Sequence, residues 1–226
     1  MGKGDWEYEQ WVSWRGGTDS DKNFSRFDIR HEFEFGLAEN FDLAVYFPEW
    51  RYEDSDAGSK TSFQGGSVEG VLYLTNPATD FLGIALYGEF GVGEDFLKFE
   101  QKLILHKDIG KFTLAYNLVF ETEIEGAFDE DEENELAGEL KHTLGVSYAL
   151  TPHWKLGGEL FVESEYADWS DHEVTTVYAG PTISYQGGRV GIGEASWWAT
   201  VTPAFQLTGE DDEPGFYFRA IVGLSF

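Results

Sequence analysis

The C-terminal stretch GFYFRAIVGLSF, residues 215–226, decides the fold class of this chain. Every even position from Phe216 to Phe226 is apolar, whereas Arg219 and Ser225 lie at odd positions. Successive side chains of a β-strand point to opposite faces, so strict alternation indicates a strand with one apolar and one polar face. The stretch therefore predicts an amphipathic strand whose last residue is aromatic.

The same alternation recurs in twelve runs along the 226 residues. Each run is roughly nine to thirteen residues long, close to what a tilted strand needs to cross a lipid bilayer. The clearest run covers residues 112–124, with Phe112, Leu114 and Leu118 on one face and Glu121 on the other. We interpret the chain as all-β: a single domain, residues 1–226, forming a closed antiparallel transmembrane β-barrel of about 12 strands in up-and-down order.

The connectors between these runs alternate in character. Those after odd-numbered strands are acidic or long: 16–23, 53–61, 93–95, 126–134, 166–173 and 209–214. Those after even-numbered strands are mostly tighter, with one longer exception: 38–40, 75–80, 106–111, 151–153 and 186–194. Short turns on one rim and long polar loops on the other are typical of membrane barrels, whereas the alternative, a soluble Greek-key sandwich, has no reason to segregate them. An even strand number also places both termini on the short-turn rim, which we expect to be periplasmic.

Composition excludes several classes of protein. The absence of cysteine excludes disulfides and thiolate metal sites, and a net charge of −27 disfavours nucleic acid as a partner. No run of 18 apolar residues is present, so the sequence predicts no transmembrane helix. Residues 1–12 lack the basic start and apolar run of a secretory signal peptide, and we expect that such a signal has been removed.

Two further features resemble known bacterial proteins. The C-terminal strand is similar to the closing strand of Gram-negative outer-membrane barrels, although Ile221 stands where their assembly signal usually carries glycine. Residues 139–169 (ELKHTLGVSYALTPHWKLGGELFVESEYADW), 178–188 (YAGPTISYQGG) and 197–209 (WWATVTPAFQLTG) resemble an uncharacterised family of Gram-negative bacterial outer-membrane β-barrel proteins. The resemblance implies a place in the bacterial outer membrane. It also implies contact with membrane lipid and lipopolysaccharide, and with the barrel-assembly machinery through the C-terminal strand. It implies no activity and no oligomeric state.

If the apolar faces meet lipid, the other faces line an ionic lumen. Folding neighbouring strands about the centres of their connectors sets Glu9 opposite Arg30 and Glu89 opposite Lys98, and opposite charges paired across strands stabilise a sheet. Closure of the last strand on the first brings Arg219 into the same group. The predicted lumen charge network is therefore Glu7, Glu9, Arg30, Arg219, Glu89 and Lys98.

A second group of lumen residues lies toward the acidic loops and is unbalanced in charge. It consists of Glu121, Glu123, Glu125, Glu159, Glu163 and Glu165, which face only Lys141 and Lys155. Unpaired buried carboxylates are costly, so water or cations must reach them. Rings of carboxylates also select cations in channels. The sequence therefore predicts an aqueous, cation-preferring vestibule.

These patterns favour a passive, cation-preferring pore for ions or small solutes. The alternative is a closed structural or adhesive barrel plugged by its own charges, since twelve strands are intermediate between filled barrels and open porins. A lipid hydrolase is less favoured: outer-membrane phospholipases carry an outward His with a Ser two residues later, but His142 is followed by Thr143 and Leu144. No common catalytic or nucleotide motif is present, so we predict no catalytic residue and no cofactor.

The acidic connectors offer a separate possibility. Carboxylate oxygens are the ligands that Ca²⁺ and Mg²⁺ prefer. Weak binding of these ions is one interpretation of three loop segments, and plain solvated loops are the other. The segments are Asp129 to Glu133, Glu210 to Glu213, and Asp54 with Asp56.

Overall fold

The computed structural model describes residues 1–128, 134–189 and 195–226, and most of them belong to strands. The strands are β1 (Trp6–Gly16), β2 (Ser25–Ala38), β3 (Phe41–Ser55), β4 (Gly58–Tyr73), β5 (Gly83–Val92), β6 (Phe96–Ile109), β7 (Phe112–Glu125), β8 (Glu135–Ala149), β9 (Trp154–Asp168), β10 (Asp171–Arg189), β11 (Ser196–Gln206) and β12 (Phe216–Ser225). Within the described ranges, no helix has the length and apolar character needed to cross a membrane.

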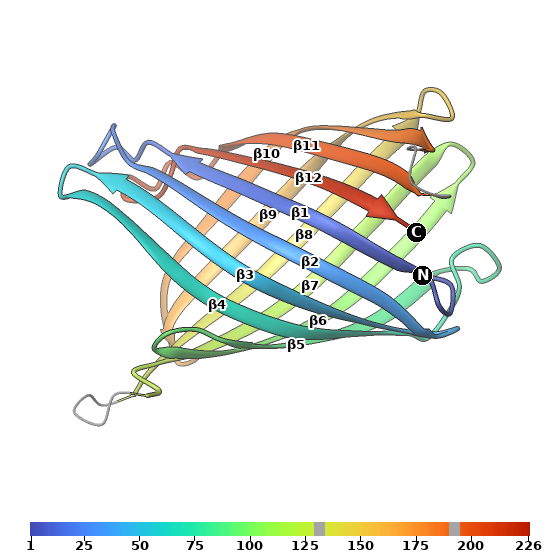
Figure 1. Cartoon of the computed structure of the whole chain (residues 1–226). Helices are drawn as coiled ribbons and strands as arrows, with labels where there is room; N and C mark the ends of the chain where they lie inside the picture. The colour runs from blue at the N-terminus through green and yellow to red at the C-terminus, as the bar shows by residue number, and fades with distance from the viewer. Residues whose placement is uncertain (129–133, 190–194) are drawn as a thin grey trace.

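The twelve strands form one closed barrel. Each strand pairs antiparallel with the next along the chain, and β12 pairs with β1. Figure 1 shows the strands inclined to the barrel axis and both termini at the same end of the barrel. The predicted fold class, an up-and-down antiparallel barrel of 12 strands, is confirmed. That the termini are periplasmic stays a prediction.

The strands carry apolar side chains on the outside of the barrel and polar ones inside, the reverse of a soluble protein. In β5, Tyr87 and Glu89 are buried on one face, at 8% and 4% exposure, whereas Leu86 and Phe90 on the other face are 45% and 44% exposed. The same parity continues around the barrel, so aliphatic and aromatic side chains cover the outside. A continuous apolar exterior around a polar interior is the arrangement that a lipid bilayer stabilises. The predicted assignment of apolar residues to the outer face is confirmed.

Closure joins the two ends of the sheet. Val12 pairs with Ala220 in the middle of the seam between β1 and β12. At its end, the Trp6 and Phe226 rings stack with centroids 3.8 Å apart, and the Phe226 amide donates to the Trp6 carbonyl at 2.9 Å. The C-terminal aromatic residue therefore packs against the first residue of β1, and neither edge strand is left open.

The connectors are the part of the fold in which the sequence prediction fails. The predicted loop 53–61 is a hairpin with its turn at 56–57, because β3 and β4 continue their pairing to Ser55 and Gly58. Gly58 has φ +120°, a backbone conformation that glycine adopts without steric cost. The predicted loop 166–173 likewise shortens to 169–170. Polar segments that were predicted to be loops thus belong to the ends of strands.

On the rim that carries the termini, connection 74–82 is as long as connection 207–215 on the other rim. Loop length therefore separates the two rims less than predicted.

The two faces of β7 provide a direct test of this arrangement. Leu118 faces outward near the middle of the strand, and its neighbour Asn117 faces the lumen and donates to Thr143. We expect Leu118→Arg to lower the free energy of unfolding by about 2–4 kcal/mol in lipid vesicles, the cost of an arginine at the membrane midplane. The matched variant Asn117→Arg places the same charge in the lumen and should cost clearly less. Reversible urea unfolding measures both, and equal losses would contradict the assignment of faces.

Candidate pore lumen

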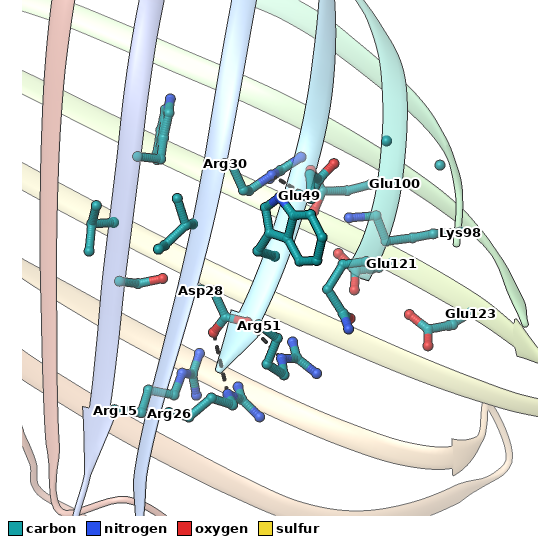
Figure 2. A pocket seen from close by; sticks show the side chains of 18 of the residues that line it. Arg15, Arg26, Asp28, Arg30, Glu49, Arg51, Lys98, Glu100, Glu121 and Glu123 are labelled. Carbon is teal, nitrogen blue, oxygen red and sulfur yellow. Dashed lines mark hydrogen bonds and ion pairs between the residues drawn. The ribbon is translucent and has the colours of Figure 1, made fainter. Parts of the chain in front are cut away.

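The interior of the barrel contains a charged cavity of about 320 Å³. It lies toward the rim opposite the termini and is bordered by residues of β1 to β8 and β12. Figure 2 shows the side chains that line it, with arginines of β1, β2 and β3 on one side and carboxylates of β7 on the other. The charged lining residues are Arg15, Arg26, Asp28, Arg30, Glu49, Arg51, Lys98, Glu100, Glu121, Glu123, Glu139, Lys141 and Arg219.

Three arginines, Arg15, Arg26 and Arg51, form what we term the basic wall. Strand register sets Arg15 directly opposite Arg26, an arrangement of like charges that is unfavourable by itself. Asp28 lies between the arginines, accepting from Arg51 Nε at 2.6 Å and lying 3.4 Å from Arg26 Nε (Figure 2). One carboxylate is thus shared by two guanidinium groups, and Arg15 takes its partner from elsewhere.

Ion pairs between non-adjacent strands connect this wall to the far side of the barrel. Arg15 on β1 donates to both carboxylate oxygens of Glu163 on β9, at 3.0 and 3.2 Å. Arg219 on β12 donates to Glu159, also on β9. A bidentate guanidinium–carboxylate pair is among the stronger hydrogen-bonded contacts in proteins. These two pairs span the lumen over three or four strands and hold β9 against the seam of the barrel.

The predicted acidic vestibule is therefore better compensated than the sequence suggested. Glu159 and Glu163 have arginine partners, and Glu121 lies 3.7 Å from Lys141 Nζ. The other three members form no ion pair within residues 1–128, 134–189 and 195–226: Glu123, Glu125 and Glu165. The prediction missed the arginines because they come from β1 and β12, which are remote in sequence from β9.

A second cluster centres on Arg30. Its guanidinium lies 2.8 Å from Glu49 and 3.1 Å from Glu89, and 4.0 Å above the ring of Tyr46. The predicted placement of Glu89 directly opposite Lys98 is wrong, although Lys98 Nζ approaches Glu89 to 3.2 Å in an ion pair. It runs diagonally, since Glu89 pairs in register with Glu100.

The predicted pairing of Glu9 with Arg30 is wrong. Glu9 lies opposite Glu32, and Arg30 lies opposite Trp11. The hairpin between β1 and β2 turns about Ser20 and Asp21, one residue later than the sequence suggested. Moving the centre of a hairpin by one residue moves every partner by two, which preserves the faces but changes the pairs.

The predicted association of Arg219 with Glu7, Glu9 and Arg30 is also wrong. Arg219 lies opposite Ser13 on β1 and pairs with Glu159 instead. Glu7 accepts a hydrogen bond from Ser225, near the rim that carries the termini. Residues at the two ends of β12 therefore contact different parts of the lumen.

Four carboxylates lie on neighbouring rungs of β1 and β2, and the predicted lumen charge network included only two of them, Glu7 and Glu9. Glu7 pairs with Glu34, and Glu9 with Glu32, all on the lumen face. Oxygens of Glu7, Glu9 and Glu34 lie within 4.8 Å of one another. Among the residues described by the structure, this is the one group of three or more potential metal ligands, and the predicted loop sites at Asp54 and Asp56 and at Glu210 to Glu213 form none. The predicted site at Asp129 to Glu133 lies outside the described residues.

At the mouth opposite the termini, the loops 17–24 and 207–215 bond to each other. The Gly215 amide donates to the Gly17 carbonyl at 2.6 Å, and the Asp19 amide donates to the Asp211 carbonyl at 2.7 Å. Burial raises the pKa of the Glu213 carboxyl in this loop, and Arg15 opposes part of that effect. Glu213 thus adds a further carboxylate beside the basic wall.

Two outward-facing histidines have a structural explanation. The Tyr116 hydroxyl lies 2.7 Å from Nδ1 of His142, and the Tyr8 hydroxyl lies 2.8 Å from Nδ1 of His31. A polar group on the lipid face is costly unless it is hydrogen-bonded, and each tyrosine supplies the bond. Thr143, next to His142, faces the lumen and accepts from Asn117. The residue after His142 therefore lies on the opposite side of the barrel wall from it.

Comparison with known proteins supports the architecture. The chain belongs to a family of unknown function, DUF6662, whose model matches residues 1–217. No curated protein matches it in sequence. Solved structures do share its fold. The COG4313 outer membrane channel from Pseudomonas putida F1 is 14% identical with a TM-score of 0.63, and the match covers 100% of this chain and 96% of that one.

Two porins are similar at the same level. The NanC porin is 9% identical with a TM-score of 0.58, covering 95% of this chain and 98% of its own. The KdgM porin is 11% identical with a TM-score of 0.54, covering 97% and 98%. At these identities the likeness shows the fold, which this chain shares with outer-membrane channels and porins.

The pair Arg15–Glu163 is suited to a double-mutant cycle. The two side chains are 17% and 9% exposed, so removing one partner leaves the other as a poorly solvated charge. We expect Arg15→Met and Glu163→Gln each to lower the free energy of unfolding by about 1–3 kcal/mol. The double variant should lose less than the sum, with a coupling of about 0.5–3 kcal/mol. Strictly additive losses in urea unfolding would show that the two groups do not interact.

Proposed function

We propose that this protein is a passive pore of the bacterial outer membrane that conducts ions and small hydrophilic solutes and favours cations. The observation that carries the proposal is the inversion of the barrel: an apolar exterior surrounds a lumen lined with ionised groups. An ionic interior needs water to solvate it, and a water-filled path through an apolar belt is a route for hydrophilic solutes.

The charge of the lumen supports the preference for cations. Glu123, Glu125 and Glu165 form no ion pair within the described ranges and lie toward the mouth opposite the termini. The chain as a whole has a net charge of −27. Carboxylates without an ion-pair partner attract cations and repel anions, even beside the basic wall. Cations should therefore enter this mouth more readily than anions.

The structural neighbours support passage rather than catalysis. The Pseudomonas putida protein is described as an outer membrane channel, and NanC and KdgM are described as porins. His142 is hydrogen-bonded to the Tyr116 hydroxyl, and Leu144 stands where outer-membrane phospholipases carry the Ser. We therefore favour a pore over a lipid hydrolase.

The surroundings of the barrel follow from the same proposal. The exposed aromatic and aliphatic side chains would contact outer-membrane lipid and lipopolysaccharide. The amphipathic strand β12, with Phe226 at its end, would be recognised by the barrel-assembly machinery before it closes on β1.

A second candidate is a closed barrel with a structural or adhesive role. It is favoured by the contacts across the lumen, in which Arg15, Arg30 and Arg219 each reach carboxylates on non-adjacent strands. If these side chains fill the cross-section, the interior is a charge network and water has no continuous path. Conductance distinguishes the two candidates directly.

Planar lipid bilayers containing the purified protein test the pore. We expect discrete conductance steps and, under a potassium chloride gradient, a reversal potential of the sign that indicates cation preference. Because Glu123 and Glu165 form no ion pair with any residue that the structure describes, the double variant Glu123→Gln, Glu165→Gln should move the reversal potential toward zero. The matched control Glu39→Gln, Asp80→Asn removes two exposed carboxylates from turns on the opposite rim and should leave it unchanged.

Other results would decide against the pore or against its selectivity. A reversal potential of the opposite sign would exclude cation preference while leaving a pore. The absence of conductance steps in the wild-type protein would favour the closed barrel. In that case Arg30→Ala, which removes the contacts to Glu49 and Glu89, should open a measurable path.

A further inference from the structure

We propose that Glu7, Glu9 and Glu34 bind a divalent cation of the Ca²⁺ or Mg²⁺ type inside the lumen, close to the rim that carries the termini. The site is separate from the charged cavity near the other mouth, and it does not depend on whether the barrel conducts. It also differs from the loop sites that the sequence suggested. The proposal rests on strand register, on the burial of Glu9 and on the hydrogen-bond partners of the surrounding groups.

The register of β1 and β2 forces acidic side chains together. Glu7 lies directly across from Glu34, and Glu9 directly across from Glu32, on consecutive lumen-facing rungs. Side chains at such positions are roughly 5 Å apart at Cβ, and like charges there destabilise the sheet. A register shifted by two residues would keep the faces and set Glu9 opposite Arg30, yet the hairpin pairs the carboxylates with one another. A cation bound between the carboxylates would offset this repulsion.

Glu9 points into this group from a buried position. It is 8% exposed, and its carboxylate lies within 4.8 Å of those of Glu7 and Glu34. Across the seam it faces Gly223, and a Cβ at Gly223 would lie 2.3 Å from the Trp198 indole, so Trp198 covers that side. An unpaired carboxylate at this depth is strongly unfavourable.

The neighbouring donors serve other oxygens. Ser225 donates to Glu7, the Trp11 indole donates to Glu32 at 3.0 Å, and the Met1 amine contacts Asp42 at 2.6 Å. Within the described ranges, no side-chain or backbone donor is bonded to Glu9 or Glu34. Among the described residues, two of the three grouped carboxylates thus have no hydrogen-bond donor from the chain.

Three carboxylates that converge in this way fit a hard divalent cation. Ca²⁺ and Mg²⁺ take oxygen ligands, with carboxylates and water completing the coordination shell. The charge of such an ion would offset the repulsion between β1 and β2, next to the seam where β12 closes the barrel. Bound cation should therefore stabilise the folded barrel, because an unfolded chain does not hold these three groups together.

Thermal unfolding of the metal-stripped barrel in detergent tests the site. We expect Ca²⁺ or Mg²⁺, added at constant ionic strength, to raise the wild-type unfolding temperature by several degrees. Glu9→Gln should unfold at a higher temperature than the wild type without cation, since it removes repulsion, and should lose the response to cation. The control Glu123→Gln removes a lumen carboxylate whose partners across the strands are Lys98 and Ala137, and should keep the full response.

Terbium provides a direct readout of occupancy. Trp11 is adjacent to Glu32, and Trp198 faces the rung of Glu9, so excitation of tryptophan should sensitise Tb³⁺ bound at this site. We expect luminescence that Ca²⁺ displaces in the wild type and in Glu123→Gln, and that is lost in Glu9→Gln and in Glu34→Gln. The second variant serves if the first does not fold.

Two results would overturn the proposal. One is an equal response to cation in the wild type and in both cluster variants, which would assign the effect to surface carboxylates. The other is a wild-type barrel that ignores both cations but gains stability as pH falls, which would show that protons neutralise the cluster. Neither result bears on the pore, because conductance is measured separately.

Discussion

Closure of the backbone ladder is the constraint on which the rest of this structure depends. In hydrocarbon no water is present to bond an exposed amide or carbonyl, so a sheet that crosses a membrane must have no free edge. Here β12 returns to β1, and every strand gains two neighbours. Once the ring is closed, the parity of each residue decides whether it meets lipid or lumen. The apolar exterior and the ionic interior are two results of that single geometric condition.

Inside the barrel, arginine is the main residue that neutralises carboxylates. Arg15, Arg30 and Arg219 each reach a carboxylate on a strand that is not their neighbour. A long side chain with a planar, multidentate head suits this task better than lysine, whose contacts here stay on the same or an adjacent strand, as in Lys98–Glu89. The result is a lumen divided into zones, with the Arg30 cluster at mid-height, the basic wall toward one rim and the carboxylates of β1 and β2 toward the other.

The sequence predicted the faces of the strands well and the pairs between them poorly, for a physical reason. Alternation in β7, for example, depends only on residues within one strand, so Phe112 and Leu118 could be assigned outward without knowing any neighbour. Pairing depends on where each hairpin turns, and an error of one residue replaced Arg30 by Glu32 opposite Glu9. Contacts such as Arg15–Glu163 join strands that only closure brings within reach, and no local pattern predicts them.

The seam between the first and last strands is held by a contact at each end. Trp6 stacks on Phe226 at one rim, and Gly215 bonds to Gly17 at the other. Until the whole chain has been made, β1 has no second neighbour, so one edge of the sheet must stay shielded from other chains throughout biogenesis. Both contacts, the Trp6–Phe226 stacking and the Gly215–Gly17 hydrogen bond, form only when β12 pairs with β1. A nascent barrel of this type thus keeps an open edge until its last strand is in place.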